Sequence, residues 1–182
     1  MLETERIAEV IDQAAVGEAW HGPALQQAVS GVGAGDARAR PVAGAHTIWE
    51  IVLHMTTWAN EVERRLRENA RPLGASEDWP APGPEGEAAW TEVKSALVDA
   101  HRMLRQTIRE FPPGRLAEQV PGSSDEDAAS FYIMLHGLAQ HDAYHAGQIA
   151  MLKKAVAASA ARIVATAKVG RAVANGGTAV SR

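Results

Sequence analysis

The sequence predicts an all-α protein, an antiparallel four-helix bundle. The predicted helical stretches are rich in alanine, leucine and glutamate, and the period-2 runs of β-branched and aromatic residues that mark strands are absent. Long stretches instead repeat apolar residues every three or four positions, as amphipathic helices do. Four such stretches of roughly 18 to 30 residues are joined by irregular segments, and a bundle is the simplest way to bury four apolar faces.

The first predicted helix spans residues 2–20. Its apolar residues recur at helical spacing and form one stripe: Ile7, Val10, Ile11, Ala14 and Ala15. The tripeptide HGP at 21–23 is expected to end this helix, because glycine and proline both interrupt helices. A short extra helix is predicted at residues 24–32, before the glycine-rich turn GVGAGDARARP.

The second and third helices carry signals at their ends. Thr47 is followed three residues later by Glu50, which makes a capping box directly before an apolar run, so the second helix is expected to begin after Thr47 and end near Leu66. A segment rich in proline and glycine then predicts a long loop. The third helix is expected over residues 86–111, where acidic residues come early and three arginines come late, in accord with the helix dipole.

A fourth helix is expected from near Asp125 to at least Lys154, so residues 1–154 complete the bundle. Residues 155–182 are predicted to be a basic, alanine-rich C-terminal extension, helical or flexible. From Lys153 onwards there are six basic residues and no acidic ones. The other interpretation is a basic amphipathic arm for a membrane surface or a partner chain, and it has few bulky apolar side chains to support it: Ile163, Val164 and Val169.

The composition argues against several classes of protein. With 182 residues, 46% of them hydrophobic, the chain is expected to fold as one globular domain. It has no cysteine, and therefore no disulfide, no thiolate ligand and no cysteine nucleophile. No apolar run is long enough to span a membrane, the N-terminus does not resemble a signal peptide, and a net charge of −4 gives no reason to expect nucleic acid as a partner. A cytoplasmic location is expected.

The nine residues HDAYHAGQI, 141–149, place His141 and His145 four positions apart on one face of the fourth helix. The same face carries four apolar residues, so both rings are expected in the bundle interior: Met134, Leu138, Ile149 and Leu152. Two imidazoles at this spacing can converge on one metal ion, but they can also be core histidines satisfied by hydrogen bonds. Four of the other five histidines are expected at the surface or at helix ends: His21, His46, His101 and His136.

The pattern HDAYH resembles the zinc-protease motif H-E-x-x-H, with Asp142 in the glutamate position. Two observations argue against a protease. Aspartate is one methylene shorter than glutamate, and residues 146–182 contain no histidine, aspartate or glutamate to act as a downstream third ligand. A third ligand must therefore lie upstream.

His54 is the candidate for that third ligand. It shares a helical face with Ile51 and Trp58, in a largely apolar helix where a surface histidine would be unusual. If the second and fourth helices are neighbours, three imidazoles meet inside the bundle. Three neutral ligands leave at least one position open for water or substrate, and nickel, zinc, iron and manganese are not distinguished by the sequence.

Three segments resemble the DinB-like family, also described as YfiT-like metal-dependent hydrolases: EAWHGPAL at 18–25, GAHTIWEIVLHMTTW at 44–58 and HDAYHAGQIAMLKK at 141–154. The resemblance covers most of residues 1–154 and has no counterpart for the extension. It implies an antiparallel four-helix bundle, often a homodimer, with one divalent metal held by three histidines, here His54, His141 and His145. The family includes thiol transferases that use low-molecular-weight thiols such as bacillithiol or mycothiol, and a thiol-dependent isomerase.

The first functional hypothesis is a metal-dependent enzyme that catalyses thiol S-transfer or hydrolysis, with a low-molecular-weight thiol or metal-activated water as the nucleophile. Trp58 is a candidate wall of the substrate pocket, and a core or interface tryptophan is the alternative. Asp142 and Tyr144 are turned away from the ligand stripe and are expected to support the ligands or an interface. No catalytic residue is assigned.

Two alternatives remain open. A non-catalytic, stress-related binding protein would hold a structural metal or none. In a metal-free bundle, the histidines would pair with carboxylates such as Glu50, Glu61 or Asp142. A fourth protein ligand that closes the metal shell would favour a structural role, whereas an open position beside a pocket would favour catalysis.

Overall fold

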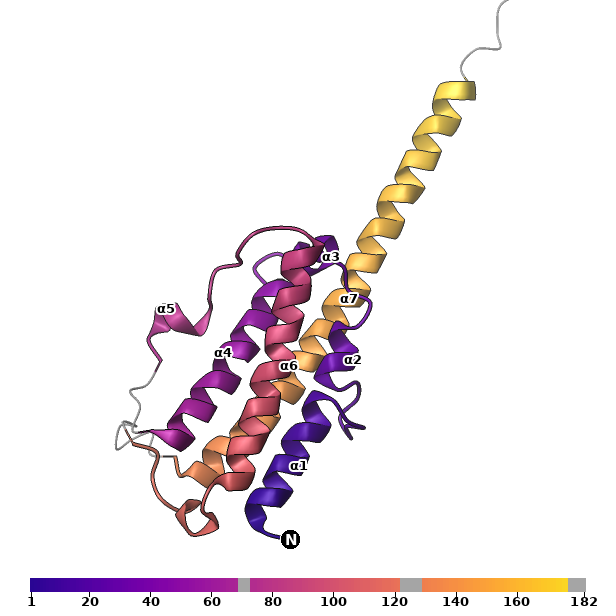
Figure 1. Ribbon diagram of the computed structural model, residues 1–182. Coiled ribbons are helices and arrows are strands. Elements are labelled where there is room, and N and C mark those ends of the chain that lie inside the picture. The colour runs from indigo at the N-terminus through magenta and orange to yellow at the C-terminus, as the bar shows by residue number, and fades with distance from the viewer. Residues whose placement is uncertain (69–72, 122–128, 177–182) are drawn as a thin grey trace, which may run out of the picture.

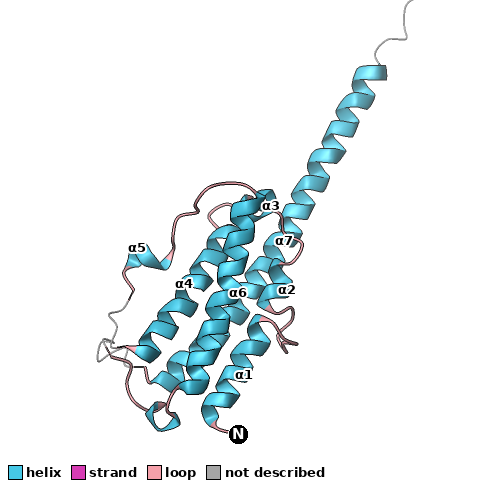
Figure 2. Ribbon diagram, viewed as in Figure 1, coloured by secondary structure: helices cyan, strands magenta, loops and turns pink. Residues whose placement is uncertain are grey.

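The computed structural model describes residues 1–68, 73–121 and 129–176, and in these ranges it contains helices and no strand (Figure 2). The four long helices are α1 (Glu3–Ala15), α4 (Ile48–Arg67), α6 (Glu87–Glu110) and α7 (Phe131–Gly176). Both α6 and α7 pack against α1 and α4. The predicted four-helix bundle is therefore confirmed.

The helices of the bundle run in two directions. Figure 1 shows α1 and α7 pointing one way and α4 and α6 pointing the other. Since α4 and α6 run in the same direction, the chain between Arg67 and Glu87 must return along the length of the bundle. This explains the long connector that the sequence predicts, which also contains the one-turn helix α5 (Ala75–Asp78).

Several helix boundaries differ from the sequence prediction. Helix α1 ends at Ala15 rather than Trp20, because the chain turns at Gly17 before it reaches HGP. The N–H groups of Val16 and Gly17 both donate to the Asp12 carbonyl, and a Cβ at Gly17 would lie 2.9 Å from the Gln13 Cα atom. Trp20 is fully exposed.

Short helices fill the segment between α1 and α4. The predicted extra helix is shorter than expected, as α2 (Leu25–Val29), and the glycine-rich turn contains another helix, α3 (Ala34–Arg38). A 3-10 turn, η1 (Pro113–Arg115), follows α6. The expected start of the last helix near Asp125 lies outside the described residues, and α7 begins at Phe131, whose N–H donates to the Glu118 carbonyl.

The capping box at the start of α4 is confirmed. The Thr47 hydroxyl accepts from the Glu50 N–H at 3.2 Å, and the Glu50 carboxylate accepts from the Thr47 N–H at 2.7 Å. Arg40 also donates two hydrogen bonds to the Glu50 carboxylate. Together these contacts fix the residue at which α4 begins.

The core consists of two apolar clusters, one at each end of the bundle. The upper cluster gathers around Trp49, Trp90 and Ile149, and the lower cluster around Leu104, Ile108 and Leu135. On α4 the change from the upper to the lower cluster falls between Met55 and Ala59, and on α7 it falls between Leu138 and Ala146. Of the histidines predicted as ligands, His141 and His145 lie in the interval on α7, and His54 lies directly before the interval on α4.

Helix α7 is one continuous helix that extends beyond the bundle to Gly176 (Figure 1). Its last contacts with the bundle include the Lys153 ammonium, which donates to the carbonyls of Ala28 and Ser30 at 3.0 and 2.8 Å. The last residue of α7 that belongs to the upper cluster is Leu152. No helix among the described residues is both long and apolar enough to cross a membrane.

We predict that Thr47→Ala lowers the free energy of unfolding by about 1 kcal/mol, because the N–H of Glu50 loses its acceptor. Urea denaturation measures the change. The control is Thr91→Ala, which removes an exposed threonine from the interior of α6 and is expected to have little effect. Equal losses in the two variants would contradict a capping role for Thr47.

Truncation after Lys154 is expected to leave the midpoint of thermal unfolding almost unchanged, because both apolar clusters and the Lys153 contacts are retained. The matched control is truncation after Gly147, which removes Ile149 and Leu152 from the upper cluster and is expected to lower the midpoint strongly. A similar fall in both proteins would mean that residues 155–176 are part of the stable core.

Candidate metal centre

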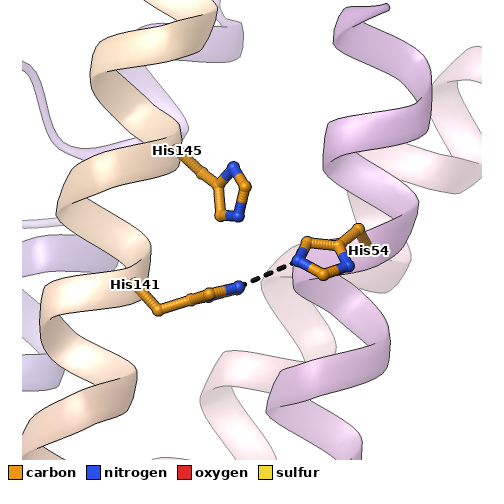
Figure 3. A group of neighbouring side chains, drawn as sticks. All are labelled: His54, His141 and His145. Carbon is orange, nitrogen blue, oxygen red and sulfur yellow. Dashed lines mark hydrogen bonds between the residues drawn. The ribbon is translucent and has the colours of Figure 1, made fainter. Parts of the chain in front are cut away.

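The three histidines predicted as ligands lie together in the middle of the bundle. His54 comes from α4, and His141 and His145 come from α7, which is its antiparallel neighbour (Figure 3). One ring nitrogen from each lies within 4.8 Å of the other two, and the Nε2 atoms of His54 and His141 are 2.9 Å apart. His54 and His145 are buried and His141 is partly exposed. This three-histidine centre could hold a metal ion.

Two of the rings are oriented by hydrogen bonds at their outer nitrogens. The Nδ1–H of His54 donates to the Asp78 backbone carbonyl at 2.8 Å, and the Nδ1–H of His145 donates to the Gln148 side-chain oxygen at 2.7 Å. These bonds place the proton on Nδ1. Each Nε2 therefore carries no hydrogen, and its lone pair is directed into the centre, as metal ligation requires.

At the third ring, His141, two buried polar atoms lack hydrogen-bond partners. Because Nε2 of His54 carries no proton, the short contact requires His141 to donate from its own Nε2. His141 Nδ1 then has no hydrogen, and neither it nor Asp142 Oδ1, 3.9 Å away, has a hydrogen-bond partner. A cation bound at His141 Nε2 would instead place the ring proton on Nδ1, facing that carboxylate oxygen. The unpartnered atoms therefore fit a metal-binding role for the centre.

Burial lowers the pKa values of His54 and His145. For His145, burial and the nearby His141 lower the pKa to about 4. For His54, burial has the largest effect, although the Asp78 carbonyl and carboxylate oppose it. Both rings are therefore neutral at pH 7, which is the protonation state in which imidazole binds a metal.

A buried ion pair lies behind His141. His101 on α6 donates from Nδ1 to the Leu97 carbonyl at 2.9 Å and from Nε2 to Asp142 Oδ2 at 3.1 Å, so its ring carries both protons. Burial alone would lower the pKa of His101, but the charge and hydrogen bond of Asp142 raise it. Burial would likewise raise the pKa of Asp142, but His101 holds it below its usual value.

The expectation that His101 is a surface or capping residue is therefore wrong, since this side chain is only 5% exposed. It lies between Leu97 and Leu104 on the inner face of α6, and that spacing was visible in the sequence. Asp142 is completely buried against His141 and His101, which agrees with a supporting position. Tyr144 is 64% exposed.

The remaining histidines and carboxylates lie outside the centre. His21 and His46 are exposed, and His136 is half-buried against the Tyr132 ring. Glu50 is paired with Arg40, and Glu61 with Arg64 and Arg65, so neither carboxylate is hydrogen-bonded to a histidine of the centre.

Trp79, which the sequence analysis missed, packs directly against the centre. Its ring is stacked between His46 and His54, with centroid distances of 3.5 and 3.8 Å and interplanar angles of 6°. It follows α5 in the returning connector, next to Asp78, whose carboxylate accepts from the Trp58 indole N–H at 2.7 Å. A single tryptophan in a loop rich in proline and glycine was the only signal in the sequence, because such a ring is seldom left in water.

Two cavities border the centre on different sides. The larger has a volume of about 770 Å³, and its lining includes His46, Trp79, Tyr144, His145, Gly147 and Gln148. The smaller, about 250 Å³, is lined by Trp58, Val62, Met134, Gly137, Leu138 and His141. Trp58 thus lines a cavity beside a candidate ligand, as a pocket wall would. A groove of about 840 Å³ between α2 and α6 contains none of the three histidines.

A family model described as the DinB superfamily matches residues 19–149, a range that includes all three histidines. The match covers well over half of the chain, so the chain belongs to the DinB superfamily. No curated protein and no solved structure matches the chain.

We predict that His54→Ala weakens the binding of nickel or zinc by more than about 100-fold, because removing one of three ligands costs more than disturbing a supporting residue. Elemental analysis and calorimetric titration measure this, with about one metal per chain expected in the unchanged protein. The matched control, His21→Ala, removes an exposed histidine and should bind metal normally. Normal metal binding by His54→Ala would show that the three-histidine site is wrong.

Proposed function

We propose that this member of the DinB superfamily is a metal-dependent enzyme in which His54, His141 and His145 hold one divalent cation and leave a position open for substrate. The observation that carries the proposal is the composition of the centre. Among the described residues, the group of possible ligands contains these three histidines and no fourth histidine, aspartate or glutamate. Three protein ligands with an open position are typical of catalytic sites, whereas structural sites are closed by a fourth ligand.

The proposed reaction is S-transfer from a low-molecular-weight thiol, or hydrolysis. A divalent cation at this centre would lower the pKa of a thiol or water molecule that reaches it and so supply the nucleophile. Because the chain has no cysteine, a sulfur nucleophile must come from a small molecule. The two neighbouring cavities provide room for organic substrates.

The chain's own residues are proposed to orient the ligands. The two nearest carboxylates, Asp78 and Asp142, lie at the outer nitrogens of His54 and His141, 3.2 and 3.9 Å away. From there they can hold the rings, but a ring separates each of them from a substrate in the centre. This arrangement supports a mechanism that needs no carboxylate base, which is why activation by the cation is favoured.

The donor set narrows the choice of metal. Imidazole nitrogen suits zinc, nickel and iron, whereas manganese prefers oxygen ligands. We therefore favour zinc, nickel or iron over manganese at this centre.

The proposed assembly is a homodimer in the cytoplasm. Ile133, Tyr144 and Met151 are 59, 64 and 66% exposed, and their spacing along α7 places them on the same side of that helix. An exposed apolar stripe of this kind supports contact with a second copy of the chain. The cytoplasmic location rests on the lack of cysteine, which fits a reducing compartment.

The cobalt-substituted protein tests whether the centre is open. We expect 2-mercaptoethanol to change its visible spectrum, because the thiol can enter a free coordination position, and we expect the metal-loaded protein to turn over either a thiol with an aryl halide or a nitrophenyl ester. His141→Ala should lose both properties, and His21→Ala should keep them. A spectrum that does not respond to the thiol, with no turnover, would favour a structural metal.

A further inference from the structure

Two glycines interrupt the apolar and polar pattern of α7 close to the candidate ligands. Gly137 lies four residues before His141, and Gly147 lies two residues after His145. Neither has a positive φ angle, and a Cβ atom built on either one would meet no heavy atom within 4 Å. Glycine inside a helix costs about 1 kcal/mol relative to alanine. Both positions are exposed, and neither backbone strain nor close packing within the chain requires a glycine there.

Each glycine borders one of the two cavities beside the three-histidine centre. Gly147 and His145 line the larger cavity, and Gly137 and His141 line the smaller one. Any side chain larger than alanine at these positions would project into open space next to a candidate ligand. Both glycines are exposed, so each lies at the open side of its cavity, and a larger side chain there would narrow the entrance.

A tryptophan stands on each side of His54 and gives each cavity one aromatic wall. Trp79, in the larger cavity, is stacked on His54, whereas Trp58, in the smaller cavity, meets the His54 ring edge-on at 6.4 Å between centroids. The two cavities are thus reached past different ligands, His145 for one and His141 for the other. A molecule in one cavity does not occupy the other.

The residues that line the cavities determine which ligands fit them. No lysine, arginine, aspartate or glutamate lines either cavity. In the smaller cavity, all lining side chains except His141 are apolar. In the larger one, Gln148 uses its side-chain oxygen to hold His145, which leaves its amide N–H group as a donor. Such walls favour uncharged, largely apolar molecules, because they offer no ionic partner to a charged group.

We infer that the three-histidine centre brings together two uncharged apolar ligands, one in each cavity. The larger cavity has the volume of a site for a multi-ring organic molecule, and the smaller one has room for a single ring or a short alkyl group. The inference rests on the proposed function, because it makes the centre the meeting point of two substrates. It favours a two-substrate transfer over hydrolysis, since water needs no apolar cavity of its own.

The first experiment counts the binding sites for a small neutral probe, 4-fluorotoluene. Metal is first removed from the full-length protein with a chelator, and fluorine NMR then measures the binding of the probe. Two saturable sites are expected in the unchanged protein. Gly147→Leu should lose one of them and Gly137→Leu should lose the other, each by at least tenfold weaker binding. Gly35→Leu is the matched control. Gly35 is an exposed helical glycine, a Cβ built on it would meet no heavy atom within 4 Å, and it lines neither cavity.

The second experiment uses Prodan, a neutral naphthalene dye whose fluorescence reports an apolar environment and which is too large for the smaller cavity. One bound dye per chain is expected, with binding lost in Gly147→Leu and kept in Gly137→Leu and Gly35→Leu. The anionic analogue 1-naphthalenesulfonate should bind at least tenfold more weakly than the neutral dye. Thermal unfolding checks that the variants are folded, and a leucine in place of a helical glycine should not destabilise them.

Because the protein is metal-free in both experiments, their outcome does not depend on whether the centre binds metal, which is measured separately. The inference is overturned if 4-fluorotoluene shows fewer than two saturable sites, or if both glycine variants bind the probes as the unchanged protein does. A change of oligomeric state in Gly147→Leu with unchanged probe binding would likewise overturn it, and would show that the glycines serve a contact between copies of α7.

Discussion

A layer of titratable side chains, all but His141 buried, crosses the middle of the bundle between its two apolar clusters, and the arrangement of the helices depends on it. The layer consists of His54, His101, His141, Asp142 and His145. Buried polar groups are costly unless they are hydrogen-bonded. Their partners here come from different helices, so a shift of α4 or α6 along α7 by one turn would leave several of them unpaired. The layer therefore fixes the register of the helices, while the apolar clusters supply most of the stabilisation.

The layer contains the same residue type in two electrostatic states. His101 donates from both ring nitrogens and carries a charge, because it faces the Asp142 carboxylate. His54 and His145 donate to neutral oxygens from Nδ1 and are kept neutral by burial. Only the neutral rings have a free lone pair for a cation. His141 lies between the neutral histidines and the charged pair of His101 and Asp142. Its Nε2 faces His54, and its Nδ1 faces Asp142.

The topology of the chain completes the centre. Since α4 and α6 run in the same direction, the connector between them must pass back along the outside of the bundle (Figure 1). On its way it places Asp78 against His54 and Trp58, and Trp79 against His54 and His46. A short turn between two antiparallel helices would not have reached these positions. The connector orients a candidate ligand and lines a cavity because α4 and α6 run in the same direction.

The sequence alone determined the features that depend on neighbours within one or two helical turns. These are the four long helices, the cap at Thr47, the shared face of His141 and His145, and the unusual position of His54 in an apolar helix. The tertiary structure decided what depends on residues far apart in the chain: the pairing of His101 with Asp142 across 41 residues, and the contact of His54 with Asp78 across 24. Helical periodicity specifies which face a side chain occupies, whereas the partner it meets there depends on the packing and direction of the other helices.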